Sequence, residues 1–151
     1  MGYYVTLTST KLHIPASDFS PICEHLLSTG FLTNTDSMGG GAYQPDGKTE
    51  AWYSWVDMKA LTKHLNDHDL DAVLEDFGFD VFLDRDGNIT DLGYDDKTGD
   101  EGKLFECMAP ALKGTLHFYW SGEGGAMWKW LIRDGKLFVI DANISYPDPE
   151  V

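Results

Sequence analysis

The sequence predicts an α+β fold in which helices pack on one face of an antiparallel sheet. Three observations predict it. Apolar and polar residues alternate through the last third of the chain, whereas several stretches before it repeat apolar residues at helical spacing. The third observation is size, because 151 residues with 42% hydrophobic content suffice for one domain with its own core. We therefore expect residues 1–151 to form a single α+β domain.

The first element is a strand, because residues 3–8 alternate with the period of two that is typical of a half-buried strand. A helix follows, for which Ser17 or Ser20 is the expected cap and Gly30 the expected end. Residues 33–48 are polar and include three consecutive glycines, so we expect a long loop there.

The middle of the chain combines a β-prone segment, residues 51–56, with two short helices, the first of which Asp57 is expected to cap. Two strands then flank residues 84–87, whose Asp-Gly signal predicts a hairpin turn. Residues 103–112 are expected to form a last helix, and Pro110 ends its regular part.

The last third predicts a three-strand antiparallel meander. Its turns are expected at residues 122–125 and 134–135, which are rich in glycine. The apolar positions of the three strands are Leu116, Phe118 and Trp120, then Trp128, Trp130 and Ile132, then Phe138, Ile140 and Ala142.

Composition excludes several classes of function. The chain has 25 acidic and 11 basic residues, a formal charge of −14, which argues against direct binding to nucleic acid or to anionic membranes. No apolar run approaches the ~20 residues that cross a bilayer, and no signal-like pattern stands at the N-terminus. Cys23 and Cys107 form neither a disulfide framework nor a metal motif, which fits a reducing compartment. We expect a cytoplasmic protein.

The negative charge is concentrated in one segment. Residues 66–101, here called the acid block, hold 13 acids and two bases and carry −11 of the −14. Apolar residues are interleaved with the acids, so we expect the acid block to be folded. A helix is expected to run to about Phe77, and Asp67, Asp71 and Glu75 at spacings of four would lie ~6 Å apart along one line.

Two interpretations of the acid block stay open. It could be a solvated surface that keeps the protein soluble. Alternatively, it could imitate the phosphates of nucleic acid, which lie roughly 6–7 Å apart along a duplex strand, and occupy a basic groove on another protein. Fixed carboxylates cost a partner less to order than a flexible acidic tail, and long-range attraction speeds association.

Other motifs are weaker. Residues 41–49 look like a phosphate loop, but five residues separate the glycines where four are required. Residues 84–89 look like part of a calcium loop, but the first and twelfth ligand positions would be Phe82 and Gly93.

Metal and catalytic side chains show no diagnostic pattern. His64 and His68 could share a metal with Asp67 or His25, although the expected helix break between the two weakens this interpretation. The two cysteines read as buried small hydrophobes. Carboxylate pairs and sugar-stacking tryptophans are available for a hydrolase, but nothing marks a specific pair.

Residues 104–136 resemble small uncharacterised acidic proteins of bacteriophages and mobile elements. The segments that carry this resemblance are Ala109-Pro110, Gly114-Thr115-Leu116, Gly122-Glu123-Gly124-Gly125, Trp128-Lys129-Trp130 and Asp134-Gly135-Lys136. They are mostly turn residues and core aromatics. The resemblance implies an early phage gene whose product neutralises a host nuclease or defence complex.

Charge and resemblance together predict a non-enzymatic acidic binding protein, a phage-encoded DNA mimic that inhibits a basic nucleic-acid-binding protein such as a restriction or CRISPR nuclease. We expect no catalytic residue, no metal and no cofactor, and the sequence leaves the oligomeric state open. An immunity protein that masks a basic nuclease toxin, or a small hydrolase using surface carboxylates beside the glycine-rich loop, are the alternatives. The expected partner-binding residues are Asp67, Asp71, Glu75, Asp84, Asp86, Asp95 and Asp96.

Overall fold

The structure is a computed structural model that describes residues 2–43, 47 and 49–142. Short 3-10 helices lie at Ala16–Asp18, Thr35–Ser37 and Ala109–Ala111. The other elements, in chain order, are β1 (Tyr4–Lys11), α1 (Phe19–Ser28), β2 (Gly40–Tyr43), β3 (Thr49–Trp52), α2 (Met58–Asn66), α3 (Leu70–Asp76), β4 (Asp80–Leu83), β5 (Ile89–Lys97), α4 (Glu101–Met108), β6 (Leu116–Gly122), β7 (Met127–Arg133) and β8 (Lys136–Asp141).

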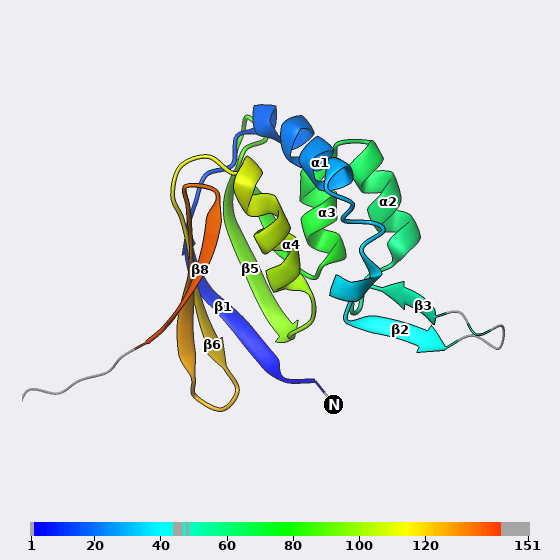
Figure 1. The fold of residues 1–151 in the computed structure, drawn as a ribbon. Coiled ribbons are helices and arrows are strands. Elements are labelled where there is room, and N and C mark those ends of the chain that lie inside the picture. Colours follow the sequence, from blue (N-terminus) through cyan, green and yellow to red (C-terminus); the bar gives the residue numbers. More distant parts are fainter. Residues whose placement is uncertain (1, 44–46, 48, 143–151) are drawn as a thin grey trace, which may run out of the picture.

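Six strands form one antiparallel sheet in the order β4-β5-β1-β6-β7-β8. The C-terminal meander β6-β7-β8 is confirmed, and β1 joins it to the hairpin β4-β5. Figure 1 shows the four helices gathered on one face of this sheet. The predicted α+β class, with helices packed on one face, is therefore confirmed. We call the other face, which no described helix covers, the open face.

Strand alternation decides which side chains meet the helices. Phe118 pairs with Trp130 and Leu7 with Trp120, and all four side chains are buried on the helix side. Phe105 of α4 packs its ring against Phe118 at 4.8 Å and against Trp130 at 5.8 Å between centroids. The intervening strand residues consequently face outward, onto the open face.

The helix ends follow local chemistry. Asp57 caps α2 by accepting hydrogen bonds from the backbone N–H groups of Lys59 and Ala60, as expected. Gly30, with φ of 79°, ends the turn after α1, also as expected. The expected serine cap of α1 is wrong, because a 3-10 turn leads directly into Phe19 and no side chain caps the helix.

The expectation of a long loop over residues 33–48 is wrong in its second half. Gly40–Tyr43 forms β2, which pairs with β3 in a separate two-stranded sheet. The glycines permit this pairing, because a Cβ on Gly40 would collide with the indole of Trp52 and one on Gly41 would lie 2.9 Å from the carbonyl oxygen of Glu50. Glycine richness here reflects close strand packing.

Among the described residues, no helix is both long and apolar enough to span a membrane.

Candidate functional site

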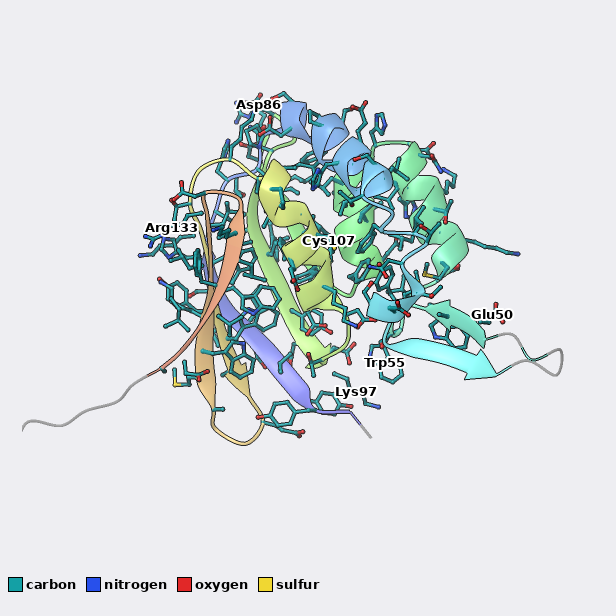
Figure 2. All side chains as sticks on the ribbon, viewed as in Figure 1. Glu50, Trp55, Asp86, Lys97, Cys107 and Arg133 are labelled. Carbon is teal, nitrogen blue, oxygen red and sulfur yellow. The ribbon has the colours of Figure 1, made fainter. Side chains whose placement is uncertain are left out.

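The seven predicted partner-binding residues lie on four different parts of the molecule. Asp67 follows α2, Asp71 and Glu75 lie on α3, Asp84 and Asp86 lie in the turn between β4 and β5, and Asp95 and Asp96 lie near the end of β5. Figure 2 shows Asp86 and Lys97, beside Asp96, at opposite ends of the molecule. The structure therefore brings these residues together in neighbouring groups and not as one surface.

The expected line of three helix carboxylates is wrong. α2 ends at Asn66 and α3 begins at Leu70, so Asp67 belongs to neither the helix nor the axis that carries Asp71 and Glu75. His68, at φ of 56°, makes the turn between the helices. The Asp67 carboxylate instead pairs with Lys63 at 2.6 Å, and this hydrogen bond lowers the pKa of Asp67 and raises that of Lys63.

Three other acids of the acid block serve the fold. The Asp100 carboxylate accepts hydrogen bonds from the backbone N–H groups of Gly39 and Ser54, both at 2.8 Å. Glu101, which is 4% exposed, accepts from the Thr98 hydroxyl and, at 2.7 Å, from the Gly99 N–H. The Asp76 carboxylate lies 2.7 Å from Nδ1 of His64. These contacts attach loops and helices to one another.

Asp84 organises the hairpin turn. Its carboxylate accepts hydrogen bonds from the backbone N–H groups of Asp86 and Asn88 and from the Asn88 side chain, at 2.9 to 3.0 Å. The hydrogen bonds from Asn88 are the largest cause that lowers the pKa of Asp84. The predicted turn is confirmed, and no group of three or more potential metal ligands exists among the residues that the structure describes.

Asp69 and Asp71 crowd their charges at the start of α3. A hydrogen bond with Asp71, together with burial and the charge of Asp71, raises the pKa of Asp69 to about 6. The neighbouring thiol of Cys23 has its pKa raised to about 12, first by burial and then by these two aspartates. That thiol therefore stays protonated at neutral pH, as expected of a buried hydrophobe.

The most regular acidic feature lies on the open face along β5. Asp91, Gly93 and Asp95 occupy alternate positions of β5 and face away from the helices, since Leu92 and Tyr94 between them are buried. Asp80 of β4 pairs with Gly93, and a Cβ on Gly93 would lie 3.4 Å from Oδ2 of Asp80. The Asp80 carboxylate thus takes the place that Gly93 leaves vacant. We call Asp80, Asp91 and Asp95 the acidic row.

Hydroxyl groups of β1 hold the two outer members of the acidic row. Thr6 donates to Oδ1 of Asp95 at 3.1 Å, and Thr10 donates to Oδ1 of Asp91. Threonine is stiff at χ1, so these donors fix the carboxylates at little entropic cost. The acidic row is therefore a set of exposed, positioned anions on a rigid strand pair.

The next outward position after Asp95 is Lys97, which ends the acidic row. Its Nζ lies 5.9 Å from the ring centroid of Tyr4 and 5.6 Å from that of Trp55. Trp55 is 69% exposed and adopts φ of 66°, and Figure 2 shows it beside Lys97. Exposed aromatic residues of this kind are typical anchors of protein interfaces.

Sequence reasoning missed Asp80 and Asp91. The signal was present, because the hairpin predicted over residues 79–92 places alternate residues on one face. It also groups Asp95 with Asp96, whereas alternation points their side chains to opposite faces of the sheet.

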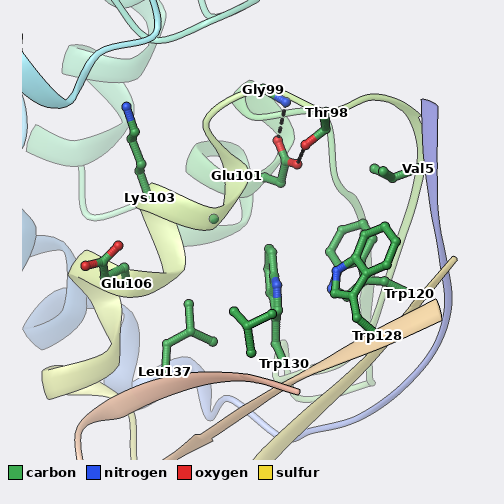
Figure 3. A pocket seen from close by; sticks show the side chains of 12 residues that line it. Val5, Thr98, Gly99, Glu101, Lys103, Glu106, Trp120, Trp128, Trp130 and Leu137 are labelled. Carbon is green, nitrogen blue, oxygen red and sulfur yellow. Dashed lines mark hydrogen bonds between the residues drawn. The ribbon is translucent and has the colours of Figure 1, made fainter. Parts of the chain in front are cut away.

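A groove of about 360 Å³ lies between the first turn of α4 and strands β6 to β8. Figure 3 shows Trp120, Trp128 and Trp130 on one side of it and Glu101 on the other. Both oxygens of Glu101 are occupied by the hydrogen bonds from Thr98 and Gly99. The groove offers mainly an aromatic wall, and Glu101 contributes to it as a structural carboxylate.

Comparisons with known proteins give no relative: no protein-family model, no curated protein and no solved structure matches this chain.

Proposed function

We propose that this chain is an acidic binding protein whose acidic row occupies a basic, nucleic-acid-binding groove on another protein. The observation that carries this proposal is the spacing of the acidic row. Successive members stand two residues apart along β5, which corresponds to about 6.8 Å in an antiparallel strand. Duplex phosphates recur at roughly 6–7 Å along a strand, so each carboxylate could take the place of one phosphate.

Rigidity and charge support the proposal. Thr6 and Thr10 hold the outer carboxylates, so the partner would not have to order them. The surrounding acid block supplies a long-range field that attracts a cationic surface and raises the association rate at low salt. Lys97 and Trp55 at the end of the acidic row add a polar and aromatic rim.

For the partner, we propose a host nuclease or defence complex, with this chain as a phage-encoded inhibitor. This part depends on the resemblance of residues 104–136 and on the charge, and the acidic row fits it. An immunity protein that masks a basic nuclease toxin would use the same carboxylates against the same kind of groove.

The test compares two variants with equal charge. The row variant carries Asp80→Asn, Asp91→Asn and Asp95→Asn, which keep the side-chain shape and can still accept the threonine hydrogen bonds. The control variant carries Asp36→Asn, Glu106→Gln and Asp134→Asn, three exposed positions outside the acidic row. Both have net charge −11 instead of −14.

Each protein is immobilised and incubated with bacterial lysate, and bound proteins are released first with duplex DNA and then with salt. We expect the wild type and the control variant to retain nucleic-acid-binding proteins that duplex DNA displaces, and the row variant to lose them. Retention of the same proteins by the row variant, or failure of duplex DNA to displace them, would contradict the proposal.

A further inference from the structure

The strand at the opposite edge of the sheet, β8, exposes apolar side chains on both of its faces. Phe138 is 41%, Val139 62% and Ile140 44% exposed. In the sheet order β8 is the last strand, and no described residue pairs with its outer edge. Natural edge strands are usually protected by proline, bulges or inward charges. β8 has none of these between Leu137 and Ile140, and its register with β7 is continuous.

The backbone of β8 offers a regular set of unpaired groups. Asp134 and Gly135, with φ of 53° and 74°, form a two-residue turn that makes Arg133 and Lys136 a hydrogen-bonded pair. At the other end of the strand, the N–H of Ala142 donates to the carbonyl of Met127 at 3.0 Å. Even-numbered residues of β8 therefore bond to β7.

It follows that Leu137, Val139 and Asp141 direct their N–H and C=O groups away from the sheet. We infer that β8 pairs with β8 of a second copy of this chain, antiparallel and symmetric about Val139. A twofold axis perpendicular to the sheet places Val139 opposite its copy, and Phe138 opposite Ile140 of the other chain. About six main-chain hydrogen bonds then join two six-stranded sheets into one continuous sheet.

Charge favours a second copy at this edge. Residues 113–142 carry four bases and three acids, whereas the acid block carries −11, so two copies meet at β8 without the repulsion of their acid blocks. Within the strand, Lys136 stands at one end and Asp141 at the other, so antiparallel pairing brings opposite charges to neighbouring positions. The other open edge, β4, begins with Asp80 and is followed by Asp84 and Asp86, and would set acids against acids.

Pairing at β8 also places a second strand beside the tryptophan-lined groove. Leu137 and Val139 form the outer part of that groove, on the helix side of β8. In the symmetric arrangement Val139 of the second copy packs against Val139 there, which removes apolar surface from water on the helix side. Phe138 and Ile140 of the two copies do the same on the open face.

The test measures molar mass by light scattering and sedimentation over about 1 to about 200 µM protein, because a dimer dissociates on dilution. One chain has a mass of 16.9 kDa. We expect the wild type to reach about twice that mass and Val139→Lys, which sets two ammonium groups face to face, to stay monomeric. Leu83→Lys is the matched control, an exposed apolar residue on the other edge strand, and it should dimerise like the wild type. Circular dichroism confirms that each variant is folded.

A second measurement identifies the contact without disturbing the dimer. Under mild oxidation Val139→Cys should form an intermolecular disulfide, since hydrogen-bonded partners in antiparallel strands have Cα atoms about 5.5 Å apart. Leu83→Cys and the wild type should not. A wild type that stays at 16.9 kDa throughout overturns the inference. So does a dimer that survives Val139→Lys, or one that Leu83→Lys alone dissociates.

Discussion

The two halves of the open face are built by the same antiparallel pairing and yet present opposite chemistry. On the β4–β5 half, outward positions carry the acidic row. On the β6–β8 half, outward positions are aromatic, aliphatic or cationic: His117, Tyr119, Lys129, Leu131, Phe138 and Ile140. Strand alternation thus fixes which residues face outward, and their chemistry decides what each half can bind.

The supporting contacts differ in the same way. Hydroxyl donors of β1 hold the carboxylates of the acidic row. On the other half, Nζ of Lys129 lies 5.2 Å from the ring centroid of Tyr119, and the guanidinium of Arg133 lies 5.8 Å from that of Phe138. One half holds anions for a partner, whereas the other covers cations with rings, which suits apolar association.

The largest expected effect comes from the side chain that joins the two halves. Trp120 is 2% exposed and packs against Tyr94 of β5 at 5.6 Å and Trp130 of β7 at 4.7 Å between centroids. Trp120→Ala should lower the free energy of unfolding by about 3–5 kcal/mol, measured by urea denaturation. Trp55→Ala, at the exposed position, is the control and should cost far less. Similar losses in both variants would contradict the described core.

A charge reversal within the acidic row should change binding and stability in opposite directions. Asp80→Lys puts a cation between Asp91 and Asp95, which should stabilise the fold by about 0.5 kcal/mol and weaken partner binding by at least about 10-fold. Urea denaturation and titration of the captured partner measure the two effects. Asp36→Lys makes the same change in net charge elsewhere and should leave affinity nearly unchanged. Equal weakening by both variants would mean that only net charge matters.

The start of α3 should lose stability as pH rises. The pKa of Asp69 is raised from 3.8 to about 6, so the folded chain holds this proton more tightly than the unfolded chain does. The stabilisation is complete below about pH 4 and is lost between about pH 4 and pH 6; solvent screening limits it to below about 1 kcal/mol. Asp69→Asn should therefore gain stability relative to the wild type at neutral pH but not at pH 4. An equal difference at both pH values would contradict the crowded pair.

The aromatic half should show the smallest effect and the opposite sign. Burial, then Lys129 and Lys11, lower the pKa of His117 from 6.5. The unfolded chain therefore takes up this proton first, and stability declines as pH falls through 6.5. His117→Gln should flatten that decline in urea denaturation between pH 7 and pH 5. An NMR titration in which His117 has a pKa at or above 6.5 would refute the assignment.

The sequence predicts most of the fold, because the outcome depends on local patterns. The meander, the Asp57 cap and the turn at residues 84–87 follow from alternation, capping chemistry and turn residues, and the structure confirms them. The β2–β3 hairpin was not predictable in this way. Its glycines are required by the indole of Trp52, a neighbour known only once the strands pair.

The candidate site was predicted only in its general location. The acid block identifies the region, but the choice among its acids depends on partners that spacing does not reveal. Asp67 is neutralised by Lys63, whereas Asp80 enters the acidic row because it pairs with Gly93. Register between two strands, not spacing within one helix, sets the carboxylate repeat.

The central claim is that the acidic row is recognised as a ladder of phosphates. The most direct test is the salt dependence of partner affinity for the wild type, the row variant and the control variant, from about 50 to about 500 mM salt. We predict that affinity falls steeply with salt for the wild type and the control variant, and that the row variant binds more weakly at low salt with a shallower slope. Three parallel lines of equal affinity would contradict the claim.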